Sequence, residues 1–182
     1  VSQLTIDGQF RPRFEFRDGY SKLTNDSSSA SAHISQRTRI GLSFAKDKFT
    51  SRVSFQDVRT WGEQKGKSMT VYPSAHELWF GVQLHKDWKI KVGRQEIAYD
   101  NQRMVGTSNY NQIGRSHDAF KIEYKKDKFA AQFTTAFNQN KPMTDGTYYD
   151  MPGFYKTLNI LWLSYATDKF KISSLTSNLE SV

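Results

Sequence analysis

Apolar and polar residues alternate along most of this chain. In residues 4–17 the even positions are apolar, and all but one of the odd positions carry a charge or an amide. The even positions hold Leu4, Ile6, Gly8, Phe10, Pro12, Phe14 and Phe16, and the odd positions hold Thr5, Asp7, Gln9, Arg11, Arg13, Glu15 and Arg17. Because successive side chains of a β-strand point to opposite faces, the segment predicts a strand with one apolar and one charged face.

The same alternation predicts further strands along the rest of the chain. They lie around residues 33–44, 49–56, 77–84, 88–92, 120–124, 129–138, 158–166 and 170–176. The segment at 158–166 is the least regular, because Ile160, Leu161, Trp162 and Leu163 are apolar on both parities. With the first segment, the pattern indicates an all-β protein of about nine strands.

Four short turns recur at nearly even spacing between these strands. Their aspartates, Asp47, Asp87, Asp127 and Asp168, are 40, 40 and 41 residues apart. This repeat predicts hairpins with tight turns at one end and long loops around residues 20–31, 61–74, 101–116 and 140–155 at the other. An aromatic residue follows each turn, so we expect an aromatic girdle at a membrane boundary from Phe49, Trp88, Phe129 and Phe170.

Strands with one oily and one charged face favour a transmembrane barrel over a soluble sandwich, because a barrel turns the charged face into an aqueous lumen. A mean hydropathy of −0.70 and the lack of an apolar run of about 18 residues exclude transmembrane helices, but they do not exclude a barrel. The chain has no cysteine, which excludes disulfides and cysteine-based zinc sites and fits a Gram-negative envelope protein. We predict an antiparallel up-and-down transmembrane β-barrel formed by one domain, residues 1–182.

The strand count adds a further expectation. Bacterial single-chain barrels have an even number of strands, and residues 177–182 lack the terminal aromatic residue commonly seen where such barrels are recognised by their assembly machinery. We therefore expect this chain to be the N-terminal half of a larger barrel. We also expect export by a signal peptide that is not part of the numbered sequence.

Charge adds a candidate function. The net charge is +8, and basic residues fall repeatedly on the predicted lumen parity: Arg11, Arg13, Arg17, Arg37, Arg39, Arg52, Lys89, Lys91 and Lys121. A low-dielectric wall lined by one sign of charge concentrates counter-ions, so anions would be favoured. An alternative is that these charges only hydrate the wall and brace it against Glu15, Glu77 and Glu123.

A second charged group follows Gly93. Arg94, Glu96, Asp100 and Arg103 break the parity of their strand, which predicts a bulge near Gly93 that turns them inward. Together with Arg115, they are expected to narrow the pore or to anchor an inward-folded loop.

Other functions find little support. His33, His76, His85 and His117 lack metal-site spacing, and no serine–histidine pair or fixed carboxylate pair indicates catalysis. Nucleic-acid binding would need basic residues clustered around exposed aromatics, and a propeller would need four strands per repeat. We therefore expect no enzyme activity, cofactor, metal or nucleic-acid partner.

Several runs of the chain carry a family resemblance. The most specific is Val92-Gly93-Arg94-Gln95-Glu96-Ile97-Ala98-Tyr99-Asp100-Asn101-Gln102-Arg103-Met104-Val105-Gly106, followed by Gly114-Arg115-Ser116-His117-Asp118-Ala119-Phe120. Supporting runs are Gln36-Arg37-Thr38-Arg39-Ile40-Gly41-Leu42, Gln56-Asp57-Val58-Arg59-Thr60-Trp61-Gly62 and His76-Glu77-Leu78-Trp79. These runs resemble the alginate-export family of outer-membrane barrels. The resemblance implies a monomeric barrel of about 18 strands with an arginine-lined pore, of which nine strands would be half. The family's substrate does not transfer with the fold.

These observations predict a porin-like channel in the Gram-negative outer membrane that passes anionic solutes or an anionic polysaccharide. The candidate pore-lining residues are Arg11, Arg13, Arg37, Arg39, Arg52, Arg94, Glu96, Arg103 and Arg115. The expected partners are outer-membrane lipid, the solute and, during biogenesis, the barrel-assembly machinery. An alternative is an accessory or client barrel in an outer-membrane assembly or secretion complex.

Overall fold

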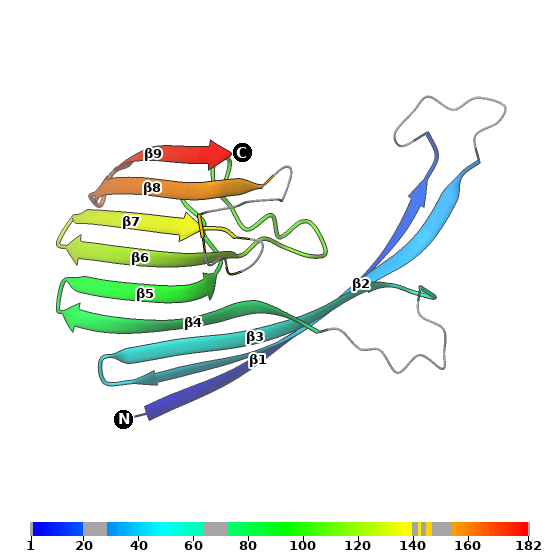
Figure 1. Cartoon of the computed structure of the whole chain (residues 1–182), viewed down its shortest axis with the longest axis horizontal. Helices are drawn as coiled ribbons and strands as arrows, with labels where there is room; N and C mark the ends of the chain where they lie inside the picture. The colour runs from blue at the N-terminus through cyan, green and yellow to red at the C-terminus, as the bar shows by residue number, and fades with distance from the viewer. Residues whose placement is uncertain are drawn as a thin grey trace.

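Nine antiparallel strands form one open sheet in which each strand pairs with its neighbours in sequence (Figure 1). The computed structural model describes residues 2–19, 29–63, 73–139, 142, 145–146 and 154–181. The strands are β1 (Ser2–Arg17), β2 (Ser31–Lys46), β3 (Phe49–Thr60), β4 (Ser74–His85), β5 (Trp88–Gln95), β6 (His117–Lys126), β7 (Phe129–Phe137), β8 (Tyr155–Ala166) and β9 (Lys171–Ser181).

The all-β, up-and-down arrangement of nine strands is therefore confirmed. Closure into a barrel, the larger barrel of which this sheet would be half, and the single domain stay predictions. In the described part of the chain, no helix is long and apolar enough to cross a membrane. Most residues of the loops predicted around 20–31, 61–74 and 140–155 lie outside the described residues.

Tight turns join the strands at one end of the sheet, as the spacing predicts. Lys46 pairs with Phe49 and Lys126 with Phe129, so two residues make each of these turns. Asp47 and Asp127 adopt left-handed backbone angles, with φ of 52° and 49°, which aspartate tolerates better than most residues.

Aromatic rings contact one another along this turn end. The ring centroids lie 5.7 Å apart in Phe49–Phe80, 4.8 Å in Trp88–Tyr124, 6.2 Å in Tyr124–Phe129 and 6.4 Å in Tyr165–Phe170. All four aromatic residues that follow the turns thus belong to this row. Its position at a membrane boundary stays a prediction.

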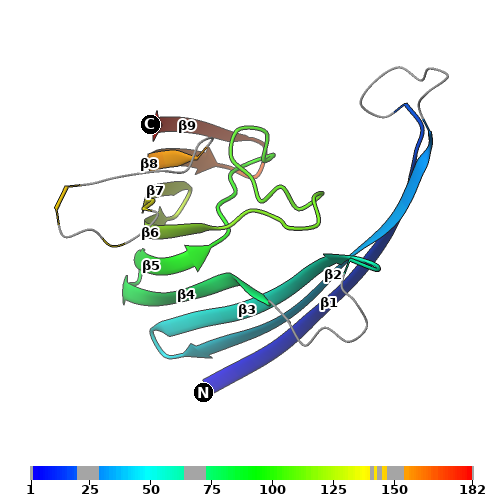
Figure 2. The same ribbon diagram turned by 45° about the vertical axis from the view of Figure 1, so that its right-hand side comes forward.

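The two faces of the sheet differ as the alternation predicts. The outward face carries exposed apolar side chains such as Leu4, Ile6 and Phe10. The inward face of β1 carries Arg11, which contacts the long connection between β5 and β6. We call this connection, residues 96–116, the strap. Figure 2 shows the sheet curving around the strap, which lies on the inward side.

The strap also explains the irregular pattern of β8. Ile160 is 0% exposed and Trp162 9%, whereas Leu161 between them is 43% exposed. The inward pair belongs to an apolar cluster with Ile97 and Tyr99 of the strap, so β8 needs apolar residues on both faces.

The prediction of a bulge near Gly93 is wrong. Gly93 pairs in register with Trp79 on one side and Ala119 on the other, and the register shifts lie instead between Ser54 and Phe55, between Gln83 and His85 and between Tyr155 and Thr157. Arg94 lies opposite Leu78, an exposed residue of the outward face, and Asp118. The register therefore places Arg94 on the outward face, because directly paired residues share a face.

Glycine at position 93 is needed for a different reason. Its φ is 115°, and an added Cβ would lie 2.3 Å from the Leu78 carbonyl oxygen. We therefore expect Gly93→Ala to cost about 1–3 kcal/mol in unfolding free energy, measured by urea unfolding in lipid vesicles. Gly8→Ala is the control, because its added Cβ would meet its nearest neighbour at 3.8 Å. Equal stability of the two variants would contradict this explanation.

Candidate functional site

The strap is attached to the sheet at three places. Its first part contacts β7–β9, where the hydroxyls of Tyr99 and Thr134 share a hydrogen bond of 2.7 Å. Trp162 Nε1 and Lys171 Nζ donate to the Asp100 carboxylate over 2.9 and 3.4 Å. With the apolar cluster around Ile160, these bonds fix the beginning of the strap. The hydrogen bond from Trp162 also lowers the pKa of the Asp100 carboxyl.

The second attachment is a lobe, residues 108–114, that reaches the inward face of β1–β3. The base of the lobe is closed, because the Arg115 amide donates to the Thr107 carbonyl over 2.7 Å. Gln56 Nε2 donates to the Ile113 carbonyl and Gln112 Nε2 donates to Ser35 Oγ, both over 2.9 Å. These contacts join the lobe to β2 and β3, whereas the first part of the strap is attached to β7–β9.

Arginines of β1 make most of the remaining bonds to the lobe. Arg11 donates to the Asn109 and Asn111 carbonyls over 2.6 and 2.5 Å and to Gln112 Oε1 over 2.9 Å. Arg13 donates to the Tyr110 carbonyl over 3.0 Å, and its guanidinium also pairs with Glu15 at 2.7 Å.

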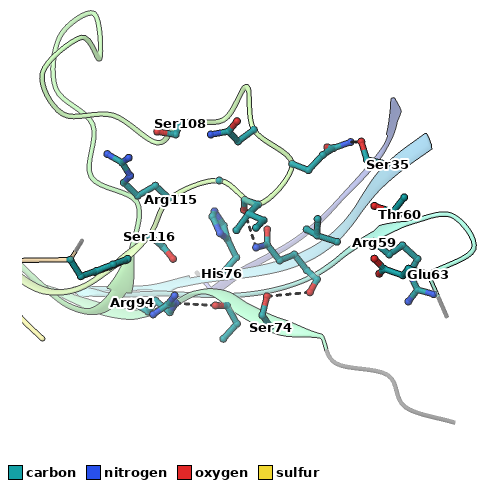
Figure 3. Close-up of a pocket in the computed structure, with 18 residues that line it drawn as sticks. Ser35, Arg59, Thr60, Glu63, Ser74, His76, Arg94, Ser108, Arg115 and Ser116 are labelled. Atoms are coloured by element: carbon teal, nitrogen blue, oxygen red, sulfur yellow. Dashed lines mark hydrogen bonds between the residues drawn. The ribbon is translucent and has the colours of Figure 1, made fainter. Parts of the chain in front are cut away.

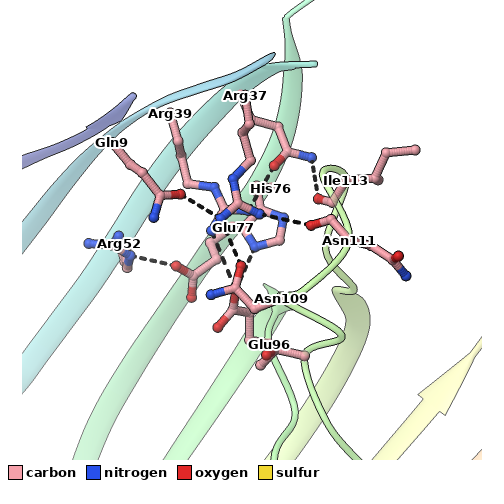
Figure 4. Close-up of polar contacts among 12 residues, drawn as sticks. Gln9, Arg37, Arg39, Arg52, His76, Glu77, Glu96, Asn109, Asn111 and Ile113 are labelled. Carbon is pink, nitrogen blue, oxygen red and sulfur yellow. Dashed lines mark hydrogen bonds and ion pairs between the residues drawn. The ribbon is translucent and has the colours of Figure 1, made fainter. Parts of the chain in front are cut away.

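Arg37 of β2 also binds the lobe, and its side chain is 0% exposed. It donates to Asn109 Oδ1 over 2.8 Å and to the Gln112 carbonyl over 3.2 Å. The Asn111 carbonyl lies 3.5 Å away, and Gln9 Oε1 accepts over 2.5 Å (Figure 4). Five oxygen atoms of the lobe, together with Gln9 Oε1, thus surround the guanidinium groups of Arg11 and Arg37.

A neighbouring cluster centres on Glu96, at the start of the strap. His76 Nε2 donates to Glu96 Oε1 over 2.7 Å, and Arg39 lies 3.5 Å from the same oxygen. Arg39 also donates to Gln56 Oε1 over 2.8 Å. The Glu96 carboxylate therefore ties the strap to β4 by the hydrogen bond from His76 and to β2 by the ion pair with Arg39.

Arg52 braces the wall next to this cluster. Its guanidinium reaches Glu77 at 2.5 Å, Asp7 at 2.7 Å and Ser43 Oγ at 2.8 Å. Gly41 leaves the space for this reach, because an added Cβ would lie 2.8 Å from both Arg52 and Asp7. Arg52 of β3 thus contacts β1, β2 and β4 on the inward face.

Two lysines that were predicted on the inward face contact aromatic rings and no carboxylate of a described residue. Lys91 Nζ lies 3.9 Å from the ring centre of Trp79, and Lys121 Nζ lies 5.5 Å from that of Tyr99. Cation–π contacts of this kind leave the charge in place while ordering the side chain.

A cavity of about 810 Å³ lies between the lobe and the loop ends of β3 and β4 (Figure 3). Most of the residues that line it are of polar type, and they include Ser35, Gln56, His76, Arg94 and Arg115. No hydrogen bond or ion pair with a described residue holds the exposed Arg115 guanidinium. Within the described ranges, no group of three or more His, Cys, Asp or Glu side chains could hold a metal ion.

The structure sorts the predicted site residues into three places. The inward face of the sheet carries Arg11, Arg13, Arg37, Arg39 and Arg52. Glu96 lies beside Arg39, at the start of the strap. Asp100, Arg103 and Arg115 lie on the strap, which is folded inward. Arg94 has the outward register and pairs with Asp118 at 3.1 Å, but it also lines the cavity with Arg115 (Figure 3).

Sequence reasoning missed the neutral partners. Gln9 and Gln112 complete the contacts of the arginines, and their parity or loop position gave no hint of this pairing. His76 falls on the outward parity of β4, but the register shift beside Phe55 brings it to Glu96.

The Glu96 cluster makes a pH-dependent prediction. The hydrogen bond from His76 holds the pKa of the Glu96 carboxyl below its ordinary value of 4.5. A carboxyl with a lowered folded-state pKa contributes stability above its ordinary pKa and loses it as the pH falls through the folded value. We expect strap attachment to weaken below pH 4.5. The readout is a lower protection of the strap amides against hydrogen exchange, relative to the intrinsic exchange rate at each pH.

Glu96→Gln is the matched variant for this test. It keeps the size of the side chain but cannot titrate, so its strap should exchange at a rate that depends less on pH than in the unmodified protein. The same pH dependence in both proteins would assign the effect to other carboxyls.

The model of the family described as alginate export matches residues 2–146. That match includes β1–β7, the strap and every candidate arginine named above. No curated protein matches the chain significantly.

Proposed function

This chain belongs to the alginate export family, a family of outer-membrane transport proteins rather than enzymes, and we propose that it forms a channel for anionic solutes. The inward face with Arg11, Arg37, Arg39 and Arg52 lines the aqueous path, and the exposed apolar outward face contacts lipid. The protein lies in the Gram-negative outer membrane. Movement is diffusion through the lumen, without an energy source or a covalent step.

The observation that carries this proposal is the distribution of arginines between the two faces. Five of the predicted arginines lie on the inward face, and the side chains of Arg11 and Arg37 form no ion pair with a described carboxylate. A low-dielectric wall with surplus positive charge raises the local concentration of anions.

The strap sets the size of what passes. The lobe lies against the inward face of β1–β3, and the rest of the strap lies against β7–β9. Small hydrated anions pass beside the strap, where the cavity lies and where Arg103 and Arg115 add positive charge. An anionic polysaccharide requires the lobe to move aside.

Uptake of three sugars into proteoliposomes tests the proposal. Glucuronate, glucose and glucosamine have similar size but negative, zero and positive charge. We expect uptake in that order for the unmodified protein, and no charge preference when Arg11, Arg37 and Arg39 are replaced by Gln. Lys86→Gln is the control, because Lys86 is exposed in the turn between β4 and β5.

Two results would overturn the proposal. Equal uptake of the three sugars by the unmodified protein would show that the basic lining does not select anions. Uptake of none of them by a correctly folded protein would favour the accessory role in an outer-membrane complex.

A further inference from the structure

Arg11 and Arg37 are enclosed by neutral oxygens alone. Every described hydrogen-bond acceptor of the two guanidiniums is a main-chain carbonyl or a side-chain amide. Within the described ranges no carboxylate lies within 4.0 Å of either group. The Asn111 carbonyl oxygen lies 2.5 Å from Arg11 and 3.5 Å from Arg37, so both groups face one point.

This arrangement is unusual for a buried cation. Arginines are almost never fully buried unless they are paired with an anion, and Arg37 is fully buried. Carbonyl and amide oxygens satisfy hydrogen bonds but do not cancel charge. The nearby carboxylates are already engaged, since Glu15 pairs with Arg13 and Glu96 with His76 and Arg39.

We propose that Arg11 and Arg37 form an oxyanion site that the lobe occupies in the absence of solute, and that a carboxylate or phosphate group displaces the lobe from it. The site deepens the proposed channel function and rests on it, because the displaced lobe would widen the path. The lobe then acts as an internal competitor of the anion.

The relative strength of the bonds favours displacement. A carboxylate or phosphate accepts two parallel hydrogen bonds from one guanidinium, and such charge-assisted bonds are roughly twice as strong as those to neutral acceptors. An oxyanion at the point now held by the Asn111 carbonyl would also neutralise the two positive charges. The lobe provides the hydrogen bonds without this neutralisation.

The lobe is built so that it can leave. Tyr110 at its tip is 76% exposed and Ile113 is 65% exposed, so little apolar surface holds it down. Ser108 and Gly114, at its two ends, have positive φ of 48° and 72°. The Thr107–Arg115 hydrogen bond closes the base, so the lobe can move while the first part of the strap stays attached to β7–β9.

Spin labels can follow this movement, because the chain contains no cysteine. Labels at Tyr110→Cys, on the lobe, and Lys48→Cys, in the turn between β2 and β3, report their separation by double electron–electron resonance in liposomes. The probes are potassium glucuronate and inorganic phosphate, each compared with potassium chloride at equal ionic strength.

We expect either oxyanion to shift the distance distribution saturably, and the stronger of the two identifies the preferred group. In Arg11→Gln and Arg37→Gln the distribution should no longer respond. Calorimetry should show binding of the same probe weakened by about 10- to 100-fold. Lys86→Gln, in the turn between β4 and β5, should respond as the unmodified protein does. Tryptophan fluorescence checks that each variant is folded.

An unchanged distribution with both probes, or an equal response in the arginine variants, would overturn the site. The outcome is separate from that of the channel proposal. Lobe movement without solute uptake would leave the oxyanion site standing and reject the channel, whereas selective uptake with an unmoved lobe would do the reverse.

Discussion

Removing the lobe will raise the single-channel conductance severalfold. The lobe, residues 108–114, lies on the inward face of β1–β3, where the proposed lumen is. Its ends are already adjacent, because the Arg115 amide bonds the Thr107 carbonyl over 2.7 Å. Two glycines can therefore replace the lobe without disturbing the rest of the strap, and planar-bilayer recording measures the effect.

The control for this variant changes the strap but keeps the lobe. Met104 is 81% exposed, so Met104→Ser should leave the conductance unchanged. An unaltered conductance in the folded lobe-deletion variant would show that the lobe does not narrow the path. The deletion also frees Arg11 and Arg37, so anion preference should be kept while conductance rises.

Ile160→Ala will cause the largest loss of stability, about 2–5 kcal/mol. Ile160 is fully buried in the cluster that joins β8 to Ile97 and Tyr99 of the strap. Removing its outer carbons leaves a cavity there, because the sheet and the strap relax only partly. Urea unfolding in lipid vesicles, followed by tryptophan fluorescence, measures the change.

Leu161→Ala is the matched comparison. It removes a similar volume from the adjacent residue, but Leu161 is on the exposed outward face. Its loss should be clearly smaller, because no closed cavity forms. Equal losses at the two positions would contradict the assignment of an inward apolar core under the strap.

The strands could be predicted from the sequence because their signal is local. An alternation with a period of two residues is present within each strand, and the turn aspartates mark where strands meet. The same pattern placed Arg11, Arg37 and Arg52 on the inward face, since parity decides the face wherever the register is regular.

The partners of these arginines could not be predicted, because their contacts are between distant residues. Arg11 and Gln112 are separated by 101 positions, and nothing in the sequence around either residue indicates that they pair. The failure at Arg94 has a different cause. Gly93 suggested a bulge, but its positive φ fits within a regular register, so Arg94 stays on the face of Val92.

The double apolar character of β8 was visible in the sequence, but its cause was not. Ile160 and Trp162 are apolar because the strap covers them, and the covering residues come from a loop with no periodic signal. Only the folded chain shows that one connection contributes both to a core and to the proposed constriction.

The most direct test of the central claim is the reversal potential of the unmodified protein across a planar bilayer under a potassium chloride gradient. Surplus positive charge on the inward face predicts a reversal potential displaced toward the chloride equilibrium value. A value displaced toward the potassium equilibrium potential would contradict an anion-selective lumen.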